Sequence, residues 1–259
     1  MNREGTIFKL IRRLYHKLMK INSIIFHWLA FFYSKELSLA YDRYLVIAPH
    51  PDDEAFGCGG LLQRLVKQGK TVHVVILTQG EAIHAKPLIS VSEIIDKRKE
   101  IALNVAQIFG LIPEQYTFLN WGDSQLHQKQ YNENRQKELT YIVETFKPEV
   151  ILLPHKVDKI GDHSHASKII YDTICKIAPS VKLLYYCVWI WFGFCYCLNW
   201  RKSFVLLMNK EEKKAKSEAI DAYVLPVDEF GIPYSGDLGE LPSICRWRKE
   251  LFFEVDIKI

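Results

Sequence analysis

Short apolar runs alternate with helical patterns from residue 44 to residue 191, and this alternation constrains the fold more than any other feature of the sequence. The runs are rich in β-branched and aromatic residues, which favour strands, and they lie at Tyr44–Ala48, 71–78, 116–121, 148–154 and 181–191. Between them, apolar residues recur every three or four positions, as in amphipathic helices, over Ala55–Gly69, Ser92–Gly110, Asn134–Phe146 and Ser164–Ile177. Strands and helices that alternate at this spacing form a mostly parallel sheet with helices on both faces.

The pattern becomes less regular towards the C-terminus. Residues 193–259 contain two further predicted strands, a charged helix and a loop rich in Gly, Pro and Asp, at Phe204–Met208, Glu250–Ile257, Lys210–Tyr223 and 226–243. We therefore expect an α/β fold with a single Rossmann-like domain over residues 44–259, whose C-terminal part is less regular. A basic, amphipathic helical extension over residues 1–43 precedes this domain.

Polar residues follow each of the first four predicted strands. The segments are "APHPDDE", "TQGE", "NWGDSQ" and "PHKVDKIGDHSH", in chain order. Ligands of open α/β sheets bind outside the carboxyl ends of the strands. These four clusters are therefore expected to meet at one edge of the sheet and to form a single site.

The first cluster has the composition of a metal site. Imidazole and carboxylate ligands suit zinc or another divalent first-row metal, so His50 and Asp53 can supply two ligands. A third ligand is expected from "GDHSH" after the fourth strand, at His163 or His165. Asp52 then remains free to take a proton from water. The alternative is that these acids only cap a helix and stabilise its dipole.

The same residues resemble the signature of the PIG-L/LmbE-like deacetylases. "APHPDDEAFGCGG" matches the family's His-Pro-Asp-Asp-Glu motif, and residues 154–163 fit the frame of its second motif without a gap. The resemblance covers about residues 43–175. It implies that His50, Asp53 and His163 bind zinc and that Asp52 is the general base. A frame shifted by two residues would make His165 the third ligand instead.

The sequence departs from the family pattern in the second motif. Ile160 and Gly161 stand where the family has His and Pro. The missing His is thought to stabilise the oxyanion or to protonate the leaving amine, and we expect His165 to take this catalytic role, with His155 as an alternative. Asp162 is expected to orient a metal ligand from outside the coordination sphere.

Two further matches to the family concern the substrate. "KRKEIALNVAQIFGL" is similar to a family helix whose Arg contacts sugar, which implies this role for Arg98, with Lys97 as an alternative. Arg98 could equally be an ordinary charge on a helix surface. "NWGDSQL" resembles the segment whose Asp binds substrate hydroxyls, here Asp123.

The resemblance implies a zinc-dependent hydrolase that removes the N-acetyl group from a GlcNAc-type amino sugar or its glycoconjugate. Polysaccharide, glycan or glycolipid biosynthesis would be its setting. Two alternatives stay open: another zinc amide or carbamoyl hydrolase, and a non-catalytic sugar-binding protein on the same fold.

Charge is distributed unevenly along the chain. Residues 1–43 carry eight Lys/Arg and three Asp/Glu, a net charge of +5, whereas the whole chain has +4, so the remainder carries about −1. The remainder shows no basic excess that would suggest a nucleic-acid partner. The apolar segment 21–33 is too short to span a bilayer. Residues 1–40 could make peripheral contact with an anionic membrane, or form a helix packed on the domain.

Cysteine usage favours a reducing compartment. The six cysteines form no CxxC pair and no small disulfide framework, which is typical of reduced thiols in a cytosolic protein. Cys195 and Cys197 lie in an aromatic stretch and are expected in the core. We therefore expect a cytoplasmic protein that can associate with membranes.

Overall fold

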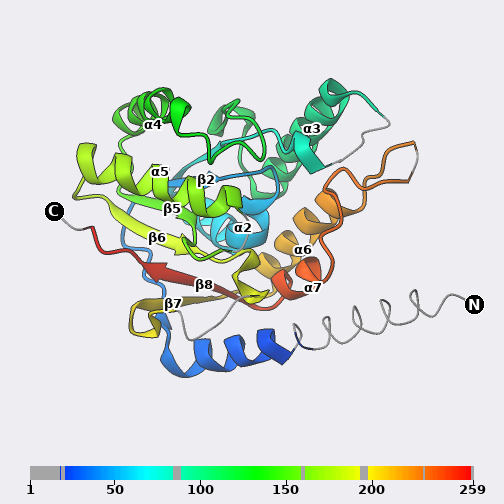
Figure 1. Ribbon diagram of the computed structural model, residues 1–259. Coiled ribbons are helices and arrows are strands. Elements are labelled where there is room, and N and C mark those ends of the chain that lie inside the picture. Colours follow the sequence, from blue (N-terminus) through cyan, green and yellow to red (C-terminus); the bar gives the residue numbers. More distant parts are fainter. Residues whose placement is uncertain are drawn as a thin grey trace, which may run out of the picture.

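A computed structural model describes residues 18, 21–83, 89–158, 161–192, 198–229 and 231–257. Its centre is an eight-stranded sheet with the strand order β1-β7-β8-β6-β5-β2-β3-β4 (Figure 1). The strands are β1 Lys35–Glu36, β2 Arg43–Ala48, β3 Thr71–Ile76, β4 Tyr116–Phe118, β5 Val150–Pro154, β6 Lys182–Tyr186, β7 Ser203–Leu207 and β8 Lys249–Glu254. β8 runs antiparallel to β6 and β7, and the other pairs are parallel. The predicted α/β class is thus confirmed.

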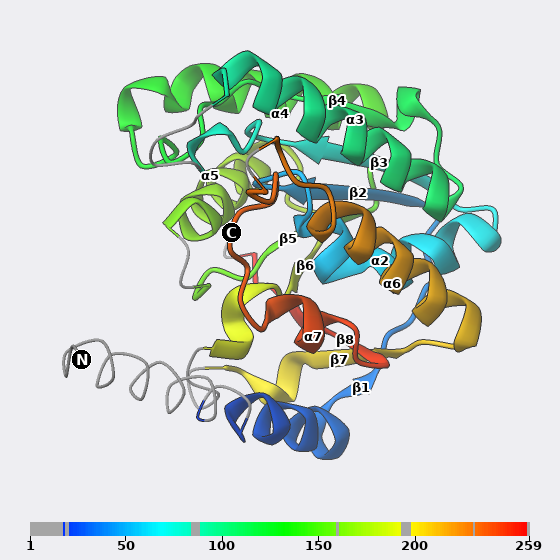
Figure 2. The same cartoon turned by 90° about the vertical axis from the view of Figure 1, so that its right-hand side faces the viewer.

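Two layers of helices flank the sheet. The helices are α2 Asp53–Lys67, α3 Val91–Phe109, α4 Asn132–Phe146, α5 Gly161–Ile177, α6 Lys210–Val224 and the short α7 Leu241–Cys245. α2, α3 and α6 pack together on one side of the sheet, while α4 packs with α5 on the other (Figure 2). Single 3₁₀ turns lie at η1 Glu81–Ile83, η2 Pro113–Gln115, η3 Lys129–Tyr131, η4 Trp189–Phe192 and η6 Trp200–Lys202. A further helix, residues 21–33, lies along the edge of the domain near β7.

The central strand β2 positions the first of the polar clusters. It lies between β5 and β3, and its residues from Tyr44 to Ala48 are all buried, as expected of a parallel strand covered on both faces. Its carboxyl end delivers the "PHPDDE" segment to the start of α2. Gly57 lets α2 approach the sheet, because a Cβ there would lie 2.3 Å from Cδ2 of Tyr186 on β6.

Several predicted boundaries differ from the structure. The strand predicted over 181–191 ends at Tyr186 and is followed by the turn η4, in which the backbone N–H of Trp189 donates to Asp158 instead of a neighbouring strand. The strand predicted over 116–121 ends at Phe118. The helix expected from Ser164 already begins at Gly161, so the "GDHSH" segment is helical.

Other expectations concern the cysteines and the N-terminal region. Cys58, Cys175, Cys187 and Cys245 are free thiols, while Cys195 and Cys197 lie outside the described residues. Within the described part of the chain, no helix is both long and apolar enough to cross a membrane. The helix over residues 21–33 packs its inner face on the domain, as one of the two interpretations expects.

Candidate metal centre and active site

The turn between β2 and α2 brings two predicted ligands together. Asp53 is the first residue of α2, and its Oδ2 accepts a hydrogen bond of 2.9 Å from the backbone N–H of His50. The same oxygen lies 3.2 Å from Nδ1 of His50. The imidazole and the carboxylate therefore face each other within one tight turn.

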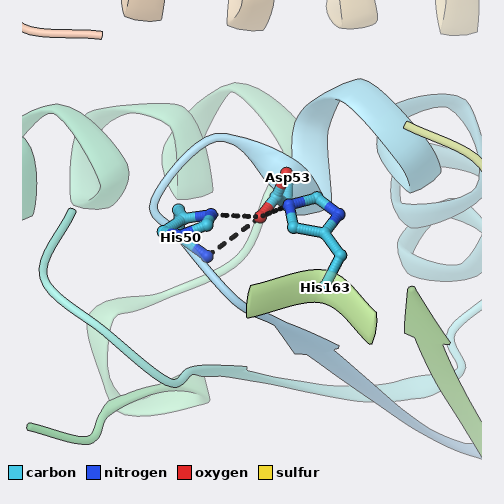
Figure 3. Close-up of side chains that lie close together, drawn as sticks. All are labelled: His50, Asp53 and His163. Carbon is cyan, nitrogen blue, oxygen red and sulfur yellow. Dashed lines mark hydrogen bonds and ion pairs between the residues drawn. The ribbon is translucent and has the colours of Figure 1, made fainter. Parts of the chain in front are cut away.

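The third predicted ligand comes from the other helix layer. His163 lies in the first turn of α5, and its Nε2 is 3.2 Å from Oδ2 of Asp53 (Figure 3). The rings of His50 and His163 have their centroids 5.4 Å apart. The structure thus brings together Asp53 and His163, which are 110 positions apart in the chain, and the ligand atoms of all three residues lie within 4.8 Å of one another.

This arrangement fits a metal ion. Two ligand atoms about 2.05 Å from a tetrahedral zinc ion are about 3.3 Å apart, close to the 3.2 Å between Asp53 Oδ2 and each imidazole nitrogen. Nε2 of His163 is buried and has no hydrogen-bond partner, although it faces the carboxylate. A cation shared by the three side chains would satisfy this nitrogen.

The electrostatics of the cluster favour positive charge between these groups. Burial alone would lower the pKa of His163, but the charges of Asp53 and Asp158 raise it to about 10. Burial would raise the pKa of Asp53, but His163 and His50 hold it well below its usual range. The charge distribution that retains a proton here also favours a divalent cation.

The two imidazoles are each oriented by carboxylates on the side away from Asp53. Nδ1 of His163 lies 3.2 Å from Oδ2 of Asp158, which also accepts the N–H of Trp189 at 3.1 Å. The sequence reasoning did not assign a role to Asp158, although it lies within the second motif. Such partners fix the tautomer and the ring orientation of metal-binding histidines.

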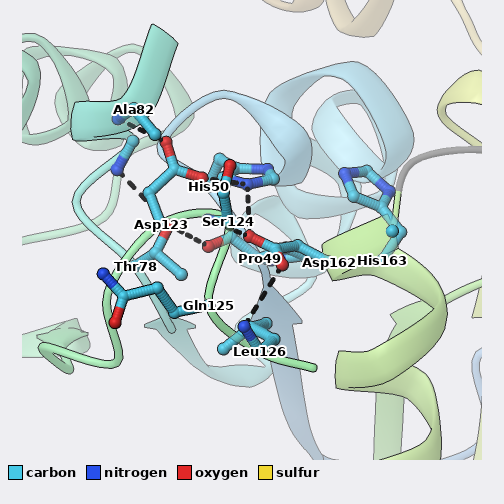
Figure 4. Close-up of polar contacts among 12 residues, drawn as sticks. Pro49, His50, Thr78, Ala82, Asp123, Ser124, Gln125, Leu126, Asp162 and His163 are labelled. Carbon is cyan, nitrogen blue, oxygen red and sulfur yellow. Dashed lines mark hydrogen bonds and ion pairs between the residues drawn. The ribbon is translucent and has the colours of Figure 1, made fainter. Parts of the chain in front are cut away.

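His50 has two such partners. Its Nε2 lies 3.2 Å from Oδ1 of Asp123 and 3.5 Å from Oδ2 of Asp162 (Figure 4). Asp162 also accepts the backbone N–H groups of Ser124 and Leu126, at 2.7 and 3.3 Å. The loop that carries Asp123 is thereby tied to the start of α5.

Both carboxylate oxygens of Asp123 have protein partners in this structure. While its Oδ1 faces His50, its Oδ2 accepts the N–H of Ala82 at 2.8 Å. The pKa of Asp123 is lowered to about 2, because the hydrogen bond and the charge of His50 outweigh the effect of burial. The structure therefore places this predicted sugar ligand against a predicted metal ligand.

Asp52 adopts a strained backbone conformation at the N-cap of α2. Its φ of 137° and ψ of −31° lie outside the regions that non-glycine residues favour, and such strain concentrates at functional sites. Asp52 occupies the N-cap position, with Asp53 and Glu54 in the first turn as the helix-cap interpretation expects, but its side chain makes no capping hydrogen bond. Burial and the charge of Asp53 raise the pKa of Asp52 to about 7, although Arg98 opposes this.

Arg98 is buried beside Asp52 and is not a surface charge of α3. Only 3% of the residue is exposed, and its Nη2 lies 3.5 Å from Oδ2 of Asp52. It donates to the carbonyl oxygens of Tyr234 at 2.6 Å and Pro51 at 2.8 Å. The alternative candidate, Lys97, instead pairs with Glu100 on the helix surface.

The glycine of the "TQGE" segment makes room for this arginine. Gly80 has a φ of +69°, and a Cβ there would lie 2.5 Å from Nε of Arg98. The turn after β3 thus contributes space to the site.

The two other candidate histidines have different surroundings. His165 is exposed on α5, where its Nδ1 lies 2.6 Å from the carbonyl oxygen of Gly161, and it lines the cavity. His155 is buried against Tyr185 and Phe253, with ring centroids 4.7 and 5.1 Å away. Because His155 packs in the core, it does not replace the missing motif histidine.

A cavity of about 450 Å³ opens over these groups, a size suited to small ligands. His127, Trp189 and the loop from Ser235 to Leu238 contribute to its wall. Most of the predicted site residues also line it: His50, Asp52, Asp53, Arg98, Asp123, Asp162 and His165. His163 lies behind this wall. Nothing in the sequence pattern placed His127 here, because only the folded loop after β4 brings its ring to 6.2 Å from that of His165 on α5.

Comparison with known proteins links this geometry to one family. Residues 45–174, half of the chain, match the PIG-L family, described as GlcNAc-PI de-N-acetylase. The diacetylchitobiose deacetylase of Thermococcus kodakarensis is 30% identical over 127 residues, which are 48% of this chain and 46% of that protein. The match thus spans about half the length of that relative.

Two solved structures share the fold. The N,N′-diacetylchitobiose deacetylase of Pyrococcus horikoshii has a TM-score of 0.58 at 18% identity, over 86% of this chain and 79% of that one. GalB, the 4-carboxy-2-hydroxymuconate hydratase of Pseudomonas putida, has a TM-score of 0.63 at 17% identity, over 84% and 98%. The hydratase shows that the fold alone does not determine the reaction.

Proposed function

The chain belongs to the PIG-L family of GlcNAc-PI de-N-acetylases, and on this premise we propose that it is a metal-dependent hydrolase of N-acetylated amino sugars. The observation that carries the proposal is the single oxygen of Asp53 that faces both His50 and His163, next to Asp52 in a cavity. The reaction would cleave the amide of a GlcNAc-type sugar and release acetate.

His50, Asp53 and His163 would hold zinc or another divalent first-row metal. The metal, when bound, would supply Lewis-acid chemistry by polarising the acetyl carbonyl and making water a better nucleophile. Asp158 would keep Nε2 of His163 directed at the centre, while Asp123 and Asp162 would do the same for Nδ1 of His50.

Asp52 would act as the general base and then as the general acid. Its carboxylate would take a proton from the attacking water and later donate that proton to the nitrogen of the departing amine. Arg98 would hold the Asp52 carboxylate in place. His165, on the cavity wall, would stabilise the oxyanion, or would protonate the leaving amine in place of Asp52.

The substrate would be an N-acetylated amino sugar or its glycoconjugate. The relatives that act on diacetylchitobiose support this class. Arg98 and Asp123 line the cavity in which the sugar would lie, and we retain them as substrate-binding candidates. We place the reaction in glycan, polysaccharide or glycolipid biosynthesis, in a cytoplasmic protein that also contacts membranes through residues 1–40.

The test combines metal content with acetate release from a panel of N-acetyl amino sugars. Asp52→Asn should keep stoichiometric metal but lower kcat roughly 10²- to 10⁴-fold, because only the base is lost. Asp228→Asn, a matched change at a buried aspartate outside the cavity lining, should leave kcat nearly unchanged. Near-normal turnover in Asp52→Asn would show that the base is wrongly assigned.

The same measurements separate the alternatives. Stoichiometric metal without acetate release from any sugar would favour another amide or carbamoyl hydrolase. A protein that binds the sugar but holds no stoichiometric metal and releases no acetate would be a non-catalytic sugar-binding protein.

A further inference from the structure

The helix over residues 21–33 is apolar on both of its sides. Its inner face buries Phe26, His27 and Ala30 against the domain, where the ring of Phe26 lies 5.7 Å from that of Trp191 and 5.9 Å from that of Trp200. A helix that packs one face on a domain normally presents polar residues on the other. This helix does not.

The outer face is a stripe of large apolar side chains. They recur at helical spacing and are between 43% and 68% exposed: Ile21, Ile24, Ile25, Trp28, Phe31 and Phe32. Residues 21–33 contain no Lys, Arg, Asp or Glu. We call these six residues the apolar stripe. An exposed apolar patch of this kind marks an interaction site.

The aromatic residues of the stripe are already organised at the surface. Trp28 stacks on Phe32 with ring centroids 5.9 Å apart, and Phe31 lies edge-on to Phe32 at 5.3 Å. Nζ of Lys249 lies 4.8 Å from the ring centre of Phe31. Aromatic rings beside a lysine are typical of the headgroup level of a membrane, where side chains contact both the apolar lipid and water.

The sequence beside the stripe is strongly basic. Residues 1–20 contain six Lys/Arg and one Glu, a net charge of +5. Basic residues close to an apolar helix face are attracted to anionic lipids. A second copy of this chain fits the stripe less well, because it carries the same basic sequence and offers no complementary negative charge.

We propose that the apolar stripe docks this protein on the surface of an anionic membrane. The helix lies in the plane of the interface, because the uncharged segment 21–33, which Lys20 and Lys35 flank in the sequence, extends only about 20 Å as a helix, whereas the hydrocarbon core is about 30 Å thick. Nδ2 of Asn22 donates to the carbonyl oxygen of Trp191 at 2.8 Å, in the turn whose Trp189 lines the cavity. The docking helix is thereby tied to a turn that contributes to the cavity wall. The proposal does not depend on the reaction.

Vesicle flotation of the full chain tests the proposal. Vesicles of phosphatidylcholine with phosphatidylglycerol should capture the protein, raised ionic strength should weaken capture, and pure phosphatidylcholine should capture much less. The variant Trp28→Gln/Phe31→Gln/Phe32→Gln should lower the partition coefficient roughly tenfold or more, because it removes most of the exposed aromatic area. The matched control Tyr141→Gln/Leu225→Gln/Val227→Gln removes three exposed apolar side chains elsewhere and should partition like the wild type.

Each remaining outcome contradicts the proposal. A wild-type protein that stays with neither vesicle type has no membrane-docking face. Concentration-dependent dimerisation that the stripe variant abolishes, without vesicle binding, would make the stripe an interface between copies. Equal partition of the stripe variant and the control would locate the binding elsewhere. Acetate release from a soluble N-acetyl sugar should be the same in wild type and both variants, which separates this test from that of the reaction.

Discussion

A buried ion pair behind α2 supports the candidate site, and replacing its cation should destabilise the fold. Nζ of Lys216 lies 2.7 Å from Oε1 of Glu250, and both residues are only 2% exposed. The Glu250 carboxylate also accepts the N–H groups of Gly60 and Leu61 in α2, at 2.7 and 2.9 Å. Lys216→Met keeps the apolar part of the side chain but leaves a buried carboxylate without a cation.

The magnitude follows from the charge that the substitution leaves behind. Breaking a buried ion pair by removing one partner costs about 3–5 kcal/mol, because the remaining charge stays buried without its counter-ion. The Glu250 carboxylate would keep the N–H groups of Gly60 and Leu61 as partners but would lose the ammonium group. We therefore expect Lys216→Met to lower the free energy of unfolding by about 3–5 kcal/mol at pH 7.

Urea unfolding of the variants measures these values. The double variant Lys216→Met/Glu250→Gln leaves no unpaired charge and keeps an amide oxygen that can accept an N–H group of α2, so it should recover about 2 kcal/mol of the loss. A single variant within about 1 kcal/mol of the wild type at pH 7 would refute the reasoning. So would a double variant that is less stable than the single one.

Three further perturbations test individual contacts. Asp158→Asn removes the charge that orients His163 and should weaken zinc affinity roughly 10- to 100-fold in a titration against a competing chelator. Burial lowers the pKa of His155 to about 3, so the unfolded chain binds a proton at this residue more readily than the folded chain does. The contribution of His155 to the free energy of unfolding should be complete above about pH 6.5 and should fall below that pH, by about 2 kcal/mol at pH 5. The variant His155→Gln should not show this loss. Gly57→Ala forces a Cβ against Tyr186 and should cost roughly 1–3 kcal/mol in urea unfolding.

Matched changes accompany these tests. Asp228→Asn alters another buried aspartate and should keep wild-type zinc affinity, so equal affinities in Asp158→Asn and the control would contradict the orienting role. Gly161→Ala adds a Cβ that meets no atom within 4 Å, so a similar cost at both glycines would show that Tyr186 is not the cause. An unchanged pH dependence in His155→Gln would assign the acid sensitivity to other groups.

The sequence predicted which segments meet at the site better than it predicted the contacts between their side chains. His50 and Asp53 share one turn, so their proximity follows from local spacing alone. His163 required the topology, because only the neighbouring parallel strands β2 and β5 bring its helix to the same edge. The alternation of strands and helices was enough to predict that step.

The roles of the surrounding carboxylates could not be predicted in the same way. Asp158 and Asp162 both precede His163 in the chain, and the sequence suggested an orienting role for Asp162. In the structure Asp158, which lies beyond the end of β5, faces Nδ1 of His163, whereas Asp162 in the first turn of α5 faces Nε2 of His50. Which imidazole each carboxylate faces depends on how α5 packs against α4 and β5, and this packing leaves no signal in the spacing of the motif.

The C-terminal part of the chain holds the site in place, although the family match ends at residue 174. Tyr223 on α6 donates to Glu54 at 2.6 Å, and Glu250 on β8 binds the N–H groups of α2. The carbonyl oxygen of Tyr234 accepts a hydrogen bond from Arg98 beside Asp52. The residues that we propose as metal ligands and as the base therefore lie in the matched half, while contacts that fix their positions come from the other half. Because these contacts join segments far apart in the sequence, periodicity could not reveal them, and the less regular C-terminal part is as necessary to the site as the motifs.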